Sequence, residues 1–181
     1  YMILTKRPER MRQFIEWYIE RSVVEGIVSF ADAYQHVLYG VTVENQQAAD
    51  ERIPSLLQIP AAKRFVSIEP MVGPVDLEDY LSPIGSITCN YGEKHRERAC
   101  SCQHKCVDWV ILGGETGPKA RPMNPDWARA VRDQCREAGV PFFLKSLGEW
   151  VPAEGLGHRV SCFNTITVGD QDFERVGKKA A

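Results

Sequence analysis

Long apolar runs are absent from this chain of 181 residues, because no stretch approaches the roughly 20 residues that a membrane-spanning helix needs. No basic segment followed by an apolar one opens the chain, so we expect no secretory signal. The formal net charge is only -2, which predicts no strong overall attraction to nucleic acid or to an anionic membrane. These absences favour a cytoplasmic protein without a membrane partner.

A GxGxxG turn is also missing from the start of every expected helix, which argues against a dinucleotide-binding fold. The composition is ordinary for a globular domain with its own core, with 44% hydrophobic and 25% charged residues.

Short apolar runs alternate with amphipathic segments along the chain. The expected strands are residues 1–4, 37–43, 64–68, 108–112 and 140–144, and the expected helices are 9–24, 46–59, 76–81 and 124–138. Such alternation implies parallel strands joined by right-handed crossovers. An open doubly wound sheet and a sector of a barrel both fit. We predict an α/β fold of parallel (β/α) repeats, a partial TIM-like barrel of about five strand–helix units.

Three of the helices carry more specific signals. In 9–24, one buried face is expected from Met11, Phe14, Ile15, Tyr18 and Ile19. Pro54 makes a continuous helix over 46–59 doubtful. In 124–138, Asn124 is a good cap, Pro125 suits the first position, and Gly139 ends the helix.

The expected domain organisation is a partial barrel over residues 1–150, with a cysteine-rich insertion at 82–107, followed by a C-terminal tail over 151–181. Extended segments in the tail are expected near position 160 and over 165–168.

Polar or glycine residues follow all five expected strands. In barrels of this type, the working residues lie at the carboxyl ends of the strands. The candidate ligand-binding residues are Lys6, Arg7, Glu44, Asn45, Glu69, Gly113, Gly114, Glu115, Arg121 and Lys145. The cations could hold a carboxylate or a phosphate, and the two glycines would let the backbone approach a ligand. Each residue alone could equally end a strand or cap a helix, and Arg121 could be a solvated loop residue.

The cysteines are clustered, with Cys89, Cys100, Cys102 and Cys106 falling close together. Thiolates at this density suit tetrahedral zinc, and a metal could order such an insertion. Free thiols and adventitious disulfides stay open as alternatives. Cys135, on a helix face, is expected to be a small core residue. The spacing CxxxCxxC is absent, since Trp109 stands where a third cysteine would follow Cys102 and Cys106.

The residues assembled above resemble a phage-associated family of uncharacterised proteins. The matching segments are LTKRPERM (4–11), GVTVENQ (40–46), RIPSLL (52–57), RFVSIEPMVGPVDL (64–77), DWVILGGETGPKARPM (108–123) and RDQCREAGVPFFLKSLGEW (132–150).

The resemblance implies a radical-SAM-like partial barrel with an N-terminal three-cysteine motif, and this chain is expected to begin after that motif. An iron–sulfur cluster and S-adenosylmethionine are therefore expected only if the missing N-terminal part is present. Two functions stay open: an enzyme acting on an unknown small-molecule or nucleic-acid-related ligand, and a non-catalytic binding or partner protein. The edges of a partial barrel are exposed, so the missing segment or a second chain is expected to cover them in an oligomer or a longer protein.

Overall fold

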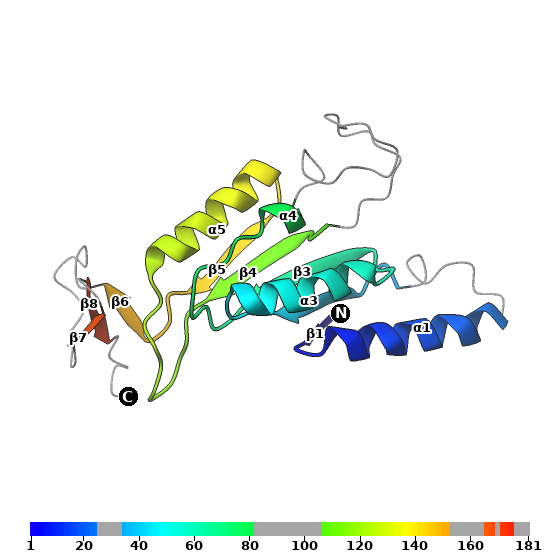
Figure 1. Ribbon diagram of the computed structural model, residues 1–181, viewed down its shortest axis with the longest axis horizontal. Coiled ribbons are helices and arrows are strands. Elements are labelled where there is room, and N and C mark those ends of the chain that lie inside the picture. Colours follow the sequence, from blue (N-terminus) through cyan, green and yellow to red (C-terminus); the bar gives the residue numbers. More distant parts are fainter. Residues whose placement is uncertain (25–33, 82–105, 153–164, 169–170, 176–181) are drawn as a thin grey trace.

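The computed structural model describes residues 1–24, 34–81, 106–152, 165–168 and 171–175 (Figure 1). Five strands in this part form one sheet in which every neighbouring pair is parallel. They are β1 (Met2–Thr5), β2 (Leu38–Thr42), β3 (Lys63–Ile68), β4 (Trp109–Gly113) and β5 (Phe142–Ser146). The predicted parallel α/β fold is confirmed.

The order of the strands, β1-β2-β3-β4-β5, decides between the two architectures that the sequence left open. A doubly wound sheet reverses its strand order at a switch point, whereas here each strand pairs with the next one along the chain. Right-handed crossovers between consecutive strands place the connecting helices on one face of the sheet. The sheet does not close on itself, which is consistent with a partial barrel.

The helices follow one another in the order of their strands (Figure 1). They are α1 (Pro8–Val24), α3 (Gln46–Gln58), α4 (Glu78–Leu81) and α5 (Pro125–Ala138). Contacts join α1 to α3 and α4 to α5. Their buried side chains pack with alternate strand residues such as Val41, Val66 and Val110. The core therefore lies between the helices and this face of the sheet.

Helix ends follow the sequence closely. The side chain of Asn124 accepts a hydrogen bond from the backbone of Asp126 at 2.9 Å, and Gly139 ends α5 in the left-handed conformation. The expectation that Pro54 interrupts the helix over residues 46–59 was wrong, because α3 continues through Pro54. Pro54 lies on the exposed side of α3, and the burial of Ile53 and Leu56 offsets the hydrogen bond that proline cannot donate.

The buried face of α1 is narrower than expected. Ile15 is buried, but the side chain of Phe14 is 61% exposed and Trp17 is 50% exposed. The inclusion of Phe14 in the buried face was therefore wrong, since on a helix of 3.6 residues per turn it lies to one side of Ile15. No helix in the described residues is long and apolar enough to span a membrane.

A second, smaller sheet follows the parallel one. It is antiparallel and has the order β6 (Trp150–Pro152), β8 (Gln171–Arg175) and β7 (Thr165–Val168). The extended segment at 165–168 is confirmed, β8 was not predicted, and position 160 lies outside the described residues. The indole nitrogen of Trp150 donates to the carbonyl of Ala120 at 2.7 Å, which ties the start of β6 to the loop after β4.

The other side of the parallel sheet, which we call the open face, carries the strand residues that point away from the helices. It includes Gly40, Phe65, Trp109 and Ile111, since neighbours in register share a face. The Phe65 ring lies over Gly40, where a Cβ atom would come within 2.5 Å of it. Its ring centroid is 6.2 Å from that of Trp109. The part of the open face around Gly40, Phe65 and Trp109 is therefore aromatic and apolar.

Candidate functional site

The carboxyl end of the sheet carries three groups of opposite charges, which together we call the rim. The first group joins β1, β2 and α3. Lys6, directly after β1, pairs with Glu44, which follows β2. Arg52 of α3 donates to the other Glu44 oxygen at 2.7 Å and to the carbonyl of Thr42 at 2.7 Å. One carboxylate thus links two strand ends to the helix layer.

The electrostatics of this group favour a charged Glu44. Its partial burial acts to raise the pKa of the carboxyl, but the hydrogen bond from Lys6 and the positive charge of Arg52 outweigh burial. The pKa of Glu44 therefore lies below its usual value, and the carboxylate is ionised at neutral pH.

The second group crosses β4. The Nζ atom of Lys145 lies 2.9 Å from Oε1 of Glu69, and the Ser67 hydroxyl donates to the other oxygen at 3.0 Å. Glu69 follows β3 and Lys145 is on β5, so the pair spans the strand between them. A Cβ atom at Gly113 would come within 2.8 Å of Oε1 of Glu69. Glycine at position 113 thus leaves room for this ion pair over the open face.

The third group follows β4. The Arg121 side chain donates to Glu115 at 2.8 Å and 3.0 Å, and its backbone N–H donates at 2.9 Å. These bonds lower the pKa of Glu115 to about 2. Arg121 is therefore paired with Glu115, a predicted strand-end residue, and this pair closes the loop that follows β4.

Replacing Arg121 by methionine should raise the pKa of Glu115 from about 2 toward its usual value of about 4.5. A depressed pKa in the folded protein adds stability that is complete above the unfolded value. That contribution is lost as the pH falls from about 4.5 to about 2. Carbon-13 NMR of the Glu115 carboxyl over this pH range measures its pKa. If the pKa is the same in the variant as in the unaltered protein, Arg121 is not what lowers it.

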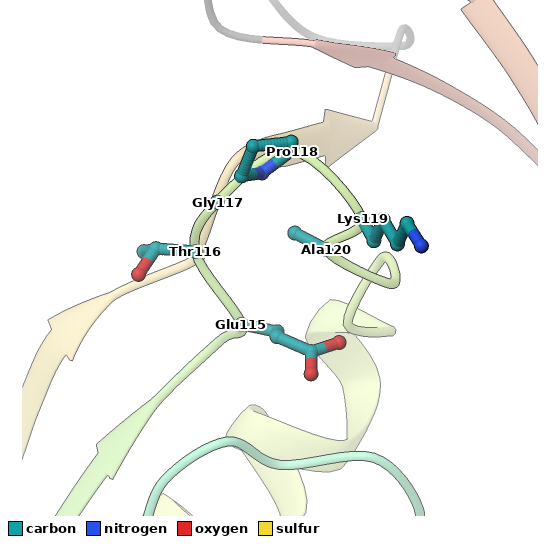
Figure 2. A pocket seen from close by; sticks show the side chains of 6 residues that line it. All are labelled: Glu115, Thr116, Gly117, Pro118, Lys119 and Ala120. Atoms are coloured by element: carbon teal, nitrogen blue, oxygen red, sulfur yellow. The ribbon is translucent and has the colours of Figure 1, made fainter.

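A hollow of about 360 Å³ opens beside the third group. Its lining is the single loop of residues 115–120, which curves around it, while the side chains of Thr116 and Lys119 point away from the arc (Figure 2). The loop is held to the next segment because Gly117 donates to Glu149 at 3.1 Å and Glu149 donates to the Glu115 carbonyl at 3.0 Å.

The remaining predicted rim residues have local roles. The Asn45 side chain accepts from the backbone of Ala48 at 3.0 Å and caps α3. The Arg7 backbone donates to the Thr5 hydroxyl at 2.9 Å, and the Arg7 side chain is exposed. A Cβ atom at Gly114 would come within 2.2 Å of the Leu147 carbonyl oxygen. This glycine therefore allows two chain segments to approach one another.

The sequence did not single out two residues of the rim, Arg52 and Ser67. Arg52 precedes the buried Ile53, so it lies at the border of the buried face of α3. Ser67 carries a hydroxyl in the apolar part of β3, among Phe65, Val66 and Ile68. A polar residue in a covered strand needs a hydrogen-bond partner, and that requirement was the available signal.

Most of the proposed zinc ligands cannot be placed, since Cys89, Cys100 and Cys102 lie outside the described residues. Cys106 is half-buried at the start of the segment leading to β4. Cys135 is buried in the core, as predicted. Within the described ranges, no group of three or more His, Cys, Asp or Glu residues could hold a metal ion.

Fold and rim together define an α/β protein with an open parallel sheet and a charged edge where its strands end. The chain belongs to the family described as "Protein of unknown function (DUF5131)", whose model matches residues 1–181. That description names no activity, so phage association and radical-SAM chemistry stay predictions. Comparison with curated proteins and with solved structures gives no match.

Proposed function

We propose that the rim binds a small anionic ligand, such as a molecule bearing a phosphate or a carboxylate. The observation that carries this proposal is the convergence of charged side chains from consecutive strand ends. Lys6 and Glu44 follow β1 and β2, Glu69 follows β3, and Lys145 reaches Glu69 from β5. A ligand in contact with several strand ends is held by a rigid frame.

The balance of charge favours an anion over a cation. The three groups of the rim contain four cations (Lys6, Arg52, Arg121 and Lys145) and three carboxylates (Glu44, Glu69 and Glu115), and the neighbouring Arg7 is exposed. The two lysines are accessible, with side chains 57% and 62% exposed. In parallel β/α units, the amino ends of the helices also point toward the strand ends, and their dipoles attract negative charge.

Replacing Lys145 by methionine should weaken the binding of inorganic phosphate about tenfold, equivalent to about 1.4 kcal/mol. Isothermal titration calorimetry of the 181-residue chain measures the effect. Lys63→Met is a matched control, because Lys63 is 60% exposed and pairs with Asp108 at 3.0 Å, but it lies at the amino end of β3. The control should change the affinity less than twofold.

Two outcomes would count against the anion site. If the unaltered chain does not bind phosphate, or if Lys63→Met weakens binding as much as Lys145→Met, the attraction is general and does not come from the rim. Binding should also weaken with salt, because both lysines are exposed.

A more specific candidate function for the rim is that of a ligand site in a radical-SAM-like enzyme. The consecutive strand order and the single layer of helices support it, since they fit the partial barrel that the resemblance implies. Any iron–sulfur cluster would have to be bound outside the described residues. Anaerobic reconstitution of the full-length protein tests it: no bound iron and sulfide and no cleavage of S-adenosylmethionine would refute the proposal.

A second candidate function is a non-catalytic binding or partner protein in which the cysteine-rich insertion holds structural zinc. Cys106 favours it, since this thiol is half-buried at the carboxyl end of that insertion. One tight site predicts close to one zinc per chain by elemental analysis. A content below about 0.2 per chain would remove the zinc proposal.

A further inference from the structure

An exposed aromatic ring shares the open face with the second group of the rim. Phe143 of β5 is in register with Ile111 of β4, and its side chain is 52% exposed. Lys145, two residues further along β5, reaches over Gly113 to Glu69. The two positions are about 7 Å apart along the strand. The pairing of β4 with β5 skips Lys145, so its place on this face follows from its ion pair with Glu69 over Gly113 and not from strand alternation.

The residues of β4 beside Phe143 are also apolar. Ile111 is only partly buried, and Trp109 precedes it by two residues on the same face of β4. The strip thus consists of an aromatic and aliphatic floor, formed by Phe143 and Ile111, with an accessible ammonium group at its end. Inorganic phosphate can use only the charged end of the strip.

We propose that this strip binds the ring of an aromatic or heteroaromatic organic anion, with the ring against Phe143 and Ile111 and the anionic group at Lys145. The inference rests on the proposed function and narrows its ligand class. Two aromatic rings pack well in offset or edge-to-face arrangements with centroids 4.5–7 Å apart. The anionic group of such a ligand is complementary to the excess positive charge of the rim.

The exposed aromatic residues of α1 do not offer the same combination. Phe14 and Trp17 lie in the helix layer, where the guanidinium of Arg21 already stacks 5.1 Å from the Trp17 ring centroid. Both residues belong to a helix and not to a strand of the sheet. Phe14, which is 61% exposed, therefore provides a matched control for Phe143.

Two fluorescent dyes test the proposal on the 181-residue chain. 1-Anilinonaphthalene-8-sulfonate carries rings and an anionic group, and N-phenyl-1-naphthylamine carries the same rings without the charge. We expect the sulfonate to bind about tenfold more tightly than the neutral dye. Phe143→Ala should weaken both dyes about tenfold, Lys145→Met should abolish the preference for the sulfonate, and Phe14→Ala should change neither affinity more than twofold. Phosphate should displace the sulfonate and leave the neutral dye bound.

The outcomes separate this inference from the proposed function. If phosphate binds in a Lys145-dependent manner but Phe143→Ala leaves both dye affinities unchanged, the ring site is refuted and the anion site remains. If Phe14→Ala has the larger effect, the dyes occupy α1 and the ring site is again refuted. If phosphate neither binds nor competes, the anion site itself is refuted.

Discussion

Replacing Gly114 by alanine should destabilise the protein by about 3 kcal/mol, the upper end of the usual range for overpacking, because the added methyl group meets backbone atoms that cannot rotate away. The new Cβ would lie 2.2 Å from the Leu147 oxygen and 2.8 Å from the Gly148 nitrogen. Gly114 donates to Ser146 at 3.0 Å, and Glu149 donates to Glu115 at 3.0 Å, so the two segments are bonded on both sides of the contact. Relief of the overlap would break these bonds and separate β5 from the end of β4.

Urea unfolding measures this loss of free energy of unfolding. In thermal unfolding, the melting temperature should fall by about 10 °C for a domain of this size. Gly73→Ala is the control, since its Cβ would meet only the Asn45 Cβ, at 3.5 Å. That variant should change the free energy of unfolding by less than about 0.5 kcal/mol. Equal effects of the two substitutions would show that the close approach at Gly114 does not hold the segments together.

Replacing Phe65 by alanine should cost about 3–5 kcal/mol, the range for a large aromatic side chain removed from a packed interior. Phe65 is 1% exposed although it lies on the open face, and its ring fills the space that Gly40 leaves on the neighbouring strand. The substitution would therefore leave a cavity against both Gly40 and Trp109.

Phe143→Ala provides the comparison on the same face, because its side chain is already 52% exposed. Its free energy of unfolding should change by less than about 1 kcal/mol. Chemical unfolding of the two variants side by side tests the assignment. A loss below about 1 kcal/mol for Phe65→Ala would mean that its ring is not part of a packed layer.

Much of the parallel sheet could be predicted from the sequence, because each strand is a short apolar run followed by polar or glycine residues. The ends of α5 were also predictable, since Asn124 and Gly139 have strong local preferences. The prediction for β5 was shifted by about two residues, and Lys145 lies inside the strand and not after it. The pairing of β4 with β5 is irregular between Leu112 and Gly113, where Ser146 and not Lys145 is the partner of Gly113. Such a bulge depends on contacts that no single strand reveals.

Buried charge was the hardest feature to predict. Arg64 is 7% exposed, which its residue type makes improbable. Its guanidinium donates to the Ile59 carbonyl at the end of α3 at 2.6 Å, and its backbone donates to Asp108 at 2.8 Å. Since Asp108 is distant along the chain, local pattern gave no indication of this pairing.

The rim shows the same division between local and distant information. The sequence predicted that Glu44, Glu69 and Lys145 are polar residues at strand ends, and the parallel strands implied that these ends share one edge of the sheet. Which groups pair could not be read, because the link from Glu69 to Lys145 depends on the missing side chain at Gly113 between them. Asn45 shows the opposite case, in which a polar residue at a strand end caps a helix.

Nitrogen-15 NMR during a phosphate titration tests the anion site most directly, because it reports on every backbone amide at once. We expect the shifts to concentrate at the strand ends, around residues 5–7, 43–45, 67–69, 113–116 and 144–147. The amino ends of the same strands, around 38, 63 and 109, should stay unchanged. Shifts that concentrate at those amino ends, or that spread evenly over the chain, would contradict a ligand site at the rim.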